Sequence, residues 1–425
     1  MSKSEIIIGI LVFAAGLLLF AIPLIAPLFL FVGAGFAFFH SRRQGYSPIG
    51  NIRDDYLRLA LIGFCGFCLA SAIWALDPGA VAKKTFVISA VLMLGSIVIR
   101  SLNFISPKTV EIFSIAILLA VSVASVLAVA DSAFGMAPIE MFFNAFPSLA
   151  PEKLKGITVE EGMIVEVESN VVNRGRAVFG FMFWPFLLMA SAYPSARLRR
   201  ILLFIAAPVV LIAVFASDSN SIQVALGLSA VAFILFRLWP VIAPRIFMAG
   251  WCAAVLLVAP ASYLAYEAGL HEAEWLSKRS ARARLYIWRF TAEQIPENPL
   301  LGIGVRSTRV FAKTHEQLEE RSDGDRYVKR PGWHAHNFYL QTWFELGAVG
   351  AAFVLGIGLL LLYRVKRLKH RIQPYGYATF VTLSGAIAFG WGMWQSWLWA
   401  GAILTVVVLL IGNLYAERRD GVCGR

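Results

Sequence analysis

Apolar runs of about twenty residues recur along the whole sequence, and they constrain the fold more than any other feature. A helix needs about twenty apolar residues to cross the hydrocarbon core of a bilayer. The sequence is 59% hydrophobic and only 15% charged, whereas soluble domains carry about 25% charged residues. Because lipid cannot satisfy backbone polar groups, such runs favour helices. The expected fold class is an all-α polytopic membrane protein.

About twelve transmembrane helices are expected from these runs. Two longer polar segments interrupt them, at residues 131–175 and 267–336. The second segment lies between the ninth and tenth expected spans, and we expect it to form a large helical loop. Residues 1–425 then make up a single membrane-embedded domain. The apolar runs lie at about 5–22, 24–39, 57–76, 85–101, 109–130, 176–193, 201–216, 221–236, 246–266, 338–363, 375–392 and 397–415.

Lys and Arg concentrate in alternate short loops, for example in Arg364, Lys366 and Arg367. The positive-inside rule places these loops, and both termini, in the cytoplasm. The segments 131–175 and 267–336 then both lie on the outer side of the membrane. Topology also explains the net charge of +12 better than nucleic-acid binding does, so no nucleic-acid partner is expected. Met1 leads directly into the first apolar run, and no cleavable signal is expected.

The stretch 332–350 joins the second outer segment to an apolar run and carries several polar side chains. Asn337 is suited to cap the helix that follows. Asn337, Gln341 and Glu345 are spaced four apart, so they share one helical face. A carboxyl group as deep as that of Glu345 marks a functional site or a buried pair. His336 lies just before the positive end of the helix dipole, which disfavours an imidazolium. We therefore interpret His336 as a neutral general base at the membrane surface.

Four arginines lie near the two outer segments. Arg174 precedes the sixth apolar run and Arg176 begins it, and Arg282 and Arg284 lie in a stretch, 280–290, that predicts an amphipathic helix. Arginine often lies at lipid headgroups without any chemical role. It is also the natural ligand of phosphate. With a histidine at a third helix mouth, these arginines suit a lipid that carries a diphosphate, whose departing charge they would stabilise without a metal.

A metal site is the alternative interpretation of the histidines. His334 and His336 can both bind one ion only on an extended segment, with His271 or His315 as a third ligand. Because the spacing fixes no third ligand, we favour the general base, with no metal and no other cofactor.

Three motifs in the sequence resemble the signature of the O-antigen ligase and O-antigen polymerase superfamily. A fourth position departs from it, because Asn220 stands where many relatives carry an arginine, so a further phosphate contact is either missing or supplied by Arg176 or Arg282. The three motifs are His336-Asn337 followed by Gly347 and Gly350, Asn173-Arg174-Gly175 followed by Trp184-Pro185, and Arg284-Leu-Tyr-Ile-Trp288 followed by residues 298–304.

The resemblance implies a glycosyltransferase of the bacterial inner membrane whose active site faces the periplasm. Its donor would be a glycan linked to undecaprenyl diphosphate, transferred en bloc by a metal-independent, inverting reaction. His336 would deprotonate the acceptor hydroxyl, and Arg174 and Arg284 would bind the diphosphate. His334 and the polar stripe of Asn337, Gln341 and Glu345 would support them.

Several functions share this machinery. A ligase would transfer the glycan to lipid A-core oligosaccharide in lipopolysaccharide biosynthesis. A polymerase would extend the growing glycan on the same lipid carrier, for O-antigen or exopolysaccharide, and a protein O-oligosaccharyltransferase would use Ser or Thr. A lipid-glycan flippase belongs to a different class and would carry ionisable residues at mid-membrane. Here the polar residues gather at one face of the membrane, which favours chemistry at the outer interface.

Overall fold

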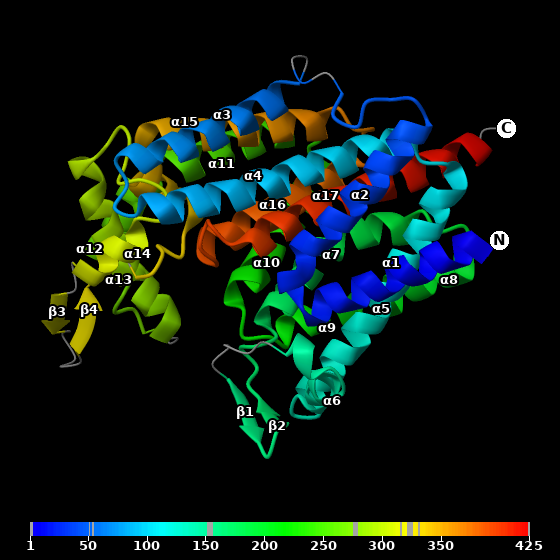
Figure 1. The fold of residues 1–425 in the computed structure, drawn as a ribbon, viewed down its shortest axis with the longest axis horizontal. Helices are drawn as coiled ribbons and strands as arrows, with labels where there is room; N and C mark the ends of the chain where they lie inside the picture. The colour runs from blue at the N-terminus through cyan, green and yellow to red at the C-terminus, as the bar shows by residue number, and fades with distance from the viewer. Residues whose placement is uncertain are drawn as a thin grey trace.

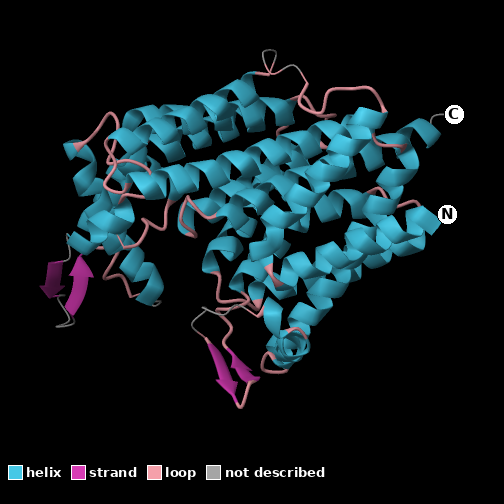
Figure 2. Cartoon of the chain, viewed as in Figure 1, coloured by secondary structure: helices cyan, strands magenta, loops and turns pink. Residues whose placement is uncertain are grey.

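A computed structural model gives the architecture of the protein, which is mainly helical (Figures 1 and 2). The structure describes residues 3–50, 52, 55–150, 156–274, 279–314, 317–320, 326–329 and 332–423. Most of the long helices lie side by side along the longest axis of the molecule (Figure 1). This arrangement is consistent with an all-α polytopic membrane protein.

The helices that correspond to the expected spans begin at residues suited to that position. Asp55, Asp77 and Ser106 each accept a backbone N–H of the following first turn, as N-cap residues do. These helices are α1 (Lys3–Ala21), α2 (Ala26–Arg43), α3 (Tyr56–Ala70), α4 (Pro78–Ser101), α5 (Pro107–Ala133), α7 (Asn173–Ser191), α8 (Ala196–Ile201), α9 (Ala207–Phe215), α10 (Asn220–Leu238), α11 (Ala243–Leu256), α12 (Val258–Glu267), α15 (Phe338–Lys366), α16 (Gln373–Phe389) and α17 (Ser396–Cys423).

Within the described residues, eight helices are long and apolar enough to cross a membrane, or nine if the bent pair α11–α12 is counted as one span. The expected number of about twelve is therefore not reached by length and composition. Three other expected spans are helical but fall outside this set. The apolar part of α1 is short, at Glu5–Ala21, and α16 has only 17 residues. Helix α7 carries Arg174 and Arg176 in its first turn. The pair α11–α12 is bent by 69°.

The two outer segments contain strands that the sequence analysis did not predict. In the first, α6 (Ala137–Ala145) is followed by the antiparallel hairpin of β1 (Ile157–Glu160) and β2 (Met163–Val167). The second holds α13 (Arg279–Gln294), α14 (Thr308–Thr314) and the hairpin of β3 (Gln317–Glu320) and β4 (Arg326–Lys329). The large loop is therefore only partly helical, because short stretches with strand-favouring residues, such as Tyr327 and Val328, can pair locally even between helices.

Helix α7 forms the centre of the bundle. Its apolar, aromatic-rich residues are buried almost throughout, from Gly175 to Phe186, against α5, α9, α16 and α17. Gly180 allows α10 to approach, because a Cβ there would lie 2.3 Å from a side-chain carbon of Ile222. The indole of Trp184 donates to the hydroxyl of Ser229 at 2.8 Å. The start of α7 is thus fixed relative to the rest of the bundle.

The two ends of the molecule differ in character. Both termini lie at the right of Figure 1, whereas α12, α13 and α14 gather with β3 and β4 at the left. The turn between α3 and α4 belongs to this left end, because the backbone N–H of Leu76 donates to the hydroxyl of Ser307 at 3.2 Å. The second polar segment therefore lies at the end of the molecule opposite to the termini (Figure 1).

Candidate active site

His336 lies in the short segment 332–337 that leads into α15. Asn337 caps this helix, because its side-chain oxygen accepts the backbone N–H groups of Tyr339 and Leu340 at 3.0 and 3.1 Å. The predicted N-cap is confirmed. His336 itself has a φ of +52°, a left-handed conformation that is uncommon for residues with a side chain. Such a conformation persists only where the surroundings enforce it, so the position of this ring is set by the fold.

The imidazole of His336 has one nitrogen engaged and one that keeps its lone pair. Its Nδ1 lies 3.2 Å from the carbonyl oxygen of Gly390, just after α16. Because a carbonyl oxygen only accepts, Nδ1 carries the proton of the neutral ring and Nε2 does not. Burial, and then the positive charge of Arg284, lower the pKa of His336, while the bond to Gly390 opposes this shift. The ring is therefore neutral at neutral pH and can accept a proton at Nε2.

His334 packs directly against this imidazole. The centroids of the two rings are 3.9 Å apart. Burial first, and then the charges of His336 and Arg284, lower the pKa of His334 to about 3. Gly392 provides the space, because a Cβ there would lie 2.7 Å from Cδ2 of His334. His334 is thus a neutral neighbour that holds the second ring in place.

Helix α13 brings Arg284 to the two imidazoles. The indole nitrogen of Trp288, one turn later, donates to the carbonyl of Ala335 at 2.9 Å and joins the helix to the histidine segment. The charge of Arg284 acts on both imidazoles. Burial lowers the pKa of Arg284 itself, but a guanidinium stays charged in proteins. One permanent cation and one neutral base therefore lie together at the entrance to α15.

The polar stripe of α15 holds the surrounding loops. The carboxyl group of Glu345, with 0% exposure, accepts five hydrogen bonds. They come from the side chain of Gln341 at 3.2 Å, the backbone N–H of Arg306 at 2.9 Å, the N–H and hydroxyl of Thr308 at 3.2 and 2.5 Å, and the indole of Trp394. A buried polar group requires such partners. Glu345 therefore fixes the loops beside the site.

Helix α15 is broken at Gly347, and a loop enters the break. Gly347 has φ 61° and ψ −160°, a conformation open almost only to glycine. The backbone N–H of Ala348 donates to the carbonyl of Pro299 at 2.9 Å, and that of Gly304 donates to the carbonyl of Glu345 at 2.8 Å. The stretch 298–304 therefore connects α13 to the break in α15 through backbone hydrogen bonds.

The segment 390–395, between α16 and α17, contributes to the site and was missed by the sequence analysis. Besides the contacts of Gly390 and Gly392 with the histidines, the backbone N–H of Met393 donates to Gln341 at 3.2 Å. The sequence Gly390-Trp391-Gly392 offered one signal, because glycines between aromatic residues at a helix end suggest close backbone approach. No feature of the sequence indicated that this segment contacts His336.

Arg174 and Arg282 occupy other positions around this end of the bundle. Nη2 of Arg282 donates to the carbonyl of Ala273 at 3.4 Å. Arg174 is half-buried, and its Nε has no hydrogen-bond partner among the described residues. Of the two candidate arginines on α13, Arg282 and Arg284, it is the charge of Arg284 that acts on the histidines.

The start of α7 is linked to the histidine site through α10. Before α7, the hydroxyl of Ser169 donates to the carboxyl group of Asp218. At the start of α10, the hydroxyl of Ser221 donates to the carbonyl of Phe389 at 2.5 Å. Phe389 is the last residue of α16, and its neighbour anchors the imidazole. The first arginine motif thus begins at the same end of the bundle as the histidine site, without a direct contact among the described residues.

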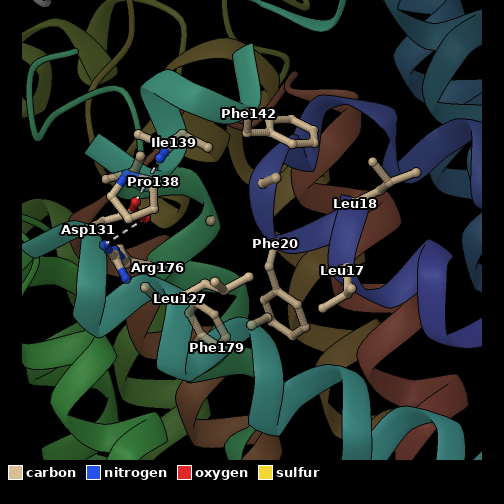
Figure 3. A pocket seen from close by; sticks show the side chains of 15 residues that line it. Leu17, Leu18, Phe20, Leu127, Asp131, Pro138, Ile139, Phe142, Arg176 and Phe179 are labelled. Carbon is tan, nitrogen blue, oxygen red and sulfur yellow. Dashed lines mark hydrogen bonds and ion pairs between the residues drawn. The ribbon is translucent and has the colours of Figure 1, made fainter. Parts of the chain in front are cut away.

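Arg176 lies beside a separate, mainly apolar cavity of about 200 Å³ (Figure 3). Its side chain is 2% exposed, and Nη2 lies 3.5 Å from Oδ2 of Asp131. Asp131 also accepts the backbone N–H of Ile139 at 3.0 Å. These contacts tie together α5, α6 and α7. The other labelled residues of the wall are Leu17, Leu18, Phe20, Leu127, Pro138, Phe142 and Phe179.

The described residues contain no group of three or more His, Cys, Asp or Glu side chains arranged to hold a metal ion. His271, one of the two third ligands considered, stacks on Tyr266 with a centroid distance of 4.0 Å. The other, His315, lies outside the described residues.

A protein-family model matches the central part of the chain. Residues 201–355 match the family model described as O-antigen ligase. The matched stretch contains Arg284, His336 and Glu345. It ends before the segment 390–395 and begins after Arg174.

Curated relatives match over a longer part of the chain than the family model does. Proteins named "Putative polysaccharide ligase" from Rickettsia conorii and Rickettsia bellii are each 26% identical, over 241 and 242 residues. One from Rickettsia typhi is 27% identical over 243 residues. Each match covers 56% of this chain and 57% or 58% of the relative, so the similarity spans little more than half of either protein. The chain is thus similar to the O-antigen ligase family over residues 201–355 and to proteins named as polysaccharide ligases over a little more than half of its length.

Proposed function

We propose that this protein is an O-antigen ligase-like glycosyltransferase of the bacterial inner membrane. It moves a glycan en bloc from undecaprenyl diphosphate to lipid A-core oligosaccharide at the periplasmic face, with both termini in the cytoplasm. The observation that carries the proposal is the pairing of a neutral imidazole, whose Nε2 keeps its lone pair, with the guanidinium of Arg284. A base beside a fixed cation suits attack by a hydroxyl on a carbon that bears an anionic leaving group.

The transfer then proceeds in one displacement. Nε2 of His336 takes the proton of the acceptor hydroxyl, and the oxygen forms a bond to the anomeric carbon. The bond from that carbon to the diphosphate breaks from the opposite face, which inverts the configuration, and its electron pair leaves with undecaprenyl diphosphate. Arg284 stabilises the charge of that leaving group. The carbonyl of Gly390 accepts a hydrogen bond from the imidazolium Nδ1 and stabilises it.

The remaining candidate residues take supporting parts in this proposal. Arg174, with a buried and unpartnered Nε among the described residues, is a second contact for the diphosphate. Arg176 is engaged with Asp131 and holds α7 in position. Asn337, Gln341 and Glu345 fix the helix entrance, and His334 supports the catalytic ring.

The function is tested by deleting the gene and separating lipopolysaccharide on a gel. We expect the O-antigen ladder to disappear while polymer accumulates on the lipid carrier. Core oligosaccharide that carries a single repeat would instead identify a polymerase. An unchanged profile would contradict a role in lipopolysaccharide and direct attention to exopolysaccharide or protein acceptors.

The site is tested by complementing the deletion with variants. His336→Ala and Arg284→Ala should each reduce transfer by at least about 100-fold, because a positioned base or charge contributes that much. Membrane expression should match the wild type. His370→Ala is the control, because this histidine is exposed and follows the far end of α15, and it should restore the ladder. Wild-type transfer by either site variant would refute the proposed chemistry.

A further inference from the structure

A cluster of four cations lies at the same end of the molecule, and the chemistry above does not use it. Lys83 and Lys84 lie in the second turn of α4, Arg306 follows the loop that enters α15, and Arg309 belongs to α14. The turn before α4 touches the segment that carries the two arginines, because the N–H of Leu76 donates to the hydroxyl of Ser307 at 3.2 Å and a Cβ on Gly304 would lie 2.4 Å from Cβ of Ala75. At this junction the positive charges of Arg306, Lys83 and Arg309 act on Lys84. In Figure 1, the start of α4 reaches the end where α13 and α14 lie. These residues are called the cationic cluster below.

Among the side chains that the structure describes, no carboxyl group forms an ion pair with any of the four members of the cationic cluster. The nearby Asp77 caps α4 through Ala80. Like charges held together repel one another, so this arrangement favours a bound anion.

The backbone fixes two members of the cluster. Arg306 has a φ of +60°, and its N–H donates to the carboxyl group of Glu345 at 2.9 Å. The guanidinium carbon of Arg309 lies 4.3 Å from the ring centroid of Trp333, a cation–π distance. Trp333 is 60% exposed and lies three residues before the catalytic histidine. Because a residue spans at most about 3.5 Å, the two positions are no more than about 10 Å apart along the chain.

Apolar surface adjoins the cationic cluster on the same elements. Phe86, on α4, is 75% exposed, and Ile73, at the end of α3, is 87% exposed. Exposed apolar residues beside lysines and a tryptophan are typical of the level where lipid headgroups begin. On the proposed orientation this level is the outer leaflet, where cations are normally scarce. The cluster therefore faces lipid headgroups rather than open solvent.

We propose that the cationic cluster and Trp333 bind the phosphate-bearing saccharide headgroup of the acceptor lipid and present its hydroxyl to His336. This inference rests on the proposed function. Two anionic lipids must meet at one base, and each needs its own cations to offset their repulsion. Arg284 acts on the two imidazoles, whereas Arg306 and Arg309 act on Lys84. The two groups of cations are thus suited to separate ligands, with the exposed indole as a surface for a sugar ring.

The first experiment measures lipid binding by the full chain in a neutral detergent. The probes are lipid A carrying two phosphates, the same lipid after enzymatic dephosphorylation, phosphatidylglycerol and inorganic phosphate. The wild type should bind the phosphorylated lipid A about tenfold more tightly than the dephosphorylated form. The double variant R306Q/R309Q should lose this preference. Equal binding of phosphatidylglycerol would reveal a general headgroup contact, and competition by millimolar inorganic phosphate would reveal a free-anion site; either result overturns the proposal.

The matched control is R42Q/R43Q at the end of α2. It removes the same charge and a comparable cation–π contact, since the guanidinium carbon of Arg42 lies 5.3 Å from the ring centroid of Phe38. The control should keep the tenfold preference. Thermal unfolding of both double variants should match the wild type, which excludes misfolding as the cause. Should R306Q/R309Q fail to fold, K84Q, which keeps both arginines, should lower the preference severalfold, and an unchanged preference there refutes the cluster.

The second experiment separates this inference from the proposed function. In a transfer assay, R306Q/R309Q should raise KM for the acceptor about tenfold and leave KM for the donor unchanged. His336→Ala should abolish transfer yet keep the lipid preference. If R306Q/R309Q keeps the wild-type KM for the acceptor while transfer still depends on His336, the proposed acceptor site is refuted and the proposed function stands. If the wild type binds phosphorylated lipid A selectively but catalyses no transfer, the proposed function is refuted and the binding site stands.

Discussion

Three contacts define the state of the imidazole of His336: the carbonyl of Gly390, the ring of His334 and the charge of Arg284. The first orients the ring and fixes its tautomer. The second adds bulk without charge. Burial and the third contact together lower the pKa of His336 and keep the ring neutral. In the proposed reaction, this neutral base would act beside a cation that stabilises the leaving group.

The pH dependence of transfer follows from this environment. A neutral His336 must accept the proton, so kcat/KM falls as the pH falls through the pKa of the free enzyme. Burial and Arg284 place that pKa below the ordinary value of about 6.5. We expect constant kcat/KM from about pH 8 down to about pH 6.5, with an acid limb only below. His370→Gln, an exposed histidine outside the site, should give the same profile. A decline that begins well above pH 7 would contradict a neutral base of lowered pKa.

The buried hydrogen bonds of Glu345 lead to a prediction about the stability of the protein. Glu345→Ala leaves five buried donors without their acceptor, and unsatisfied buried groups are costly. We expect a loss of about 3 kcal/mol or more in unfolding free energy. Glu345→Gln keeps one acceptor oxygen and should lose less. Thermal unfolding in detergent should rank the Tm values as wild type, Gln, then Ala. The exposed Glu297→Gln should leave Tm unchanged, and an equal Tm for Glu345→Ala would exclude the proposed role.

The broken helix α15 is the element on which the site depends. A continuous helix would satisfy its own backbone groups and leave no place for the stretch 298–304. The break at Gly347 exposes backbone groups that Pro299, Leu300 and Gly304 then satisfy. This connection places the loop after α13 against the carboxyl group of Glu345. The positions of Arg284 and His336 are therefore linked through backbone hydrogen bonds.

Substitution of Gly302 tests this connection. Gly302 has a φ of +63°, and a Cβ there would lie 2.4 Å from the carbonyl carbon of Glu345. Backbone cannot yield as a flexible side chain does, so Gly302→Ala should lower stability by about 2 kcal/mol or more and reduce transfer. The matched control is Gly356→Ala on α15, where a Cβ meets nothing within 4 Å; it should be neutral or slightly stabilising. Wild-type Tm and activity for Gly302→Ala would show that the loop does not fix the site.

At the scale of the whole molecule, the main feature is that its two ends carry different segments. The basic loops and the termini lie at one end, and α12, α13, α14 and the histidine segment lie at the other (Figure 1). A transfer between two lipid-linked substrates requires its groups at a single membrane face. In this protein the long apolar helices run between the two ends, and the elements that carry the candidate site lie at one of them (Figure 1).

Orientation in the membrane can be measured by cysteine labelling. In a chain with its native cysteines replaced, Glu274→Cys should react with a membrane-impermeant maleimide once the outer membrane is permeabilised. Gln44→Cys, in the basic loop after α2, should react only after the cells are lysed. Both positions are exposed, so access to the reagent depends on the side of the membrane. The reverse pattern would place the histidine site in the cytoplasm and contradict the proposed function.

The sequence by itself determined the class of fold and the identity of several site residues. Apolar runs of membrane length must become helices, because lipid offers no partners for the backbone. The N-cap at Asn337 and the amphipathic helix around Arg284 are local features, so local chemistry predicted them. The sequence did not fix the number of membrane spans. The apolar part of α1 and helix α16 are short, α7 carries two arginines, and the pair α11–α12 is bent.

Only the tertiary structure decided which residues meet. The segment 390–395 lies more than fifty residues from His336, and no periodicity connects them. The same holds for the choice of Arg284 over Arg282, and for Arg176, which pairs with Asp131 instead of approaching the histidines. The break at Gly347 is stable only because a distant loop satisfies it. Helix formation depends on neighbours along the chain, but the geometry of this site depends on hydrogen bonds between distant segments, and these exist only once the bundle has packed.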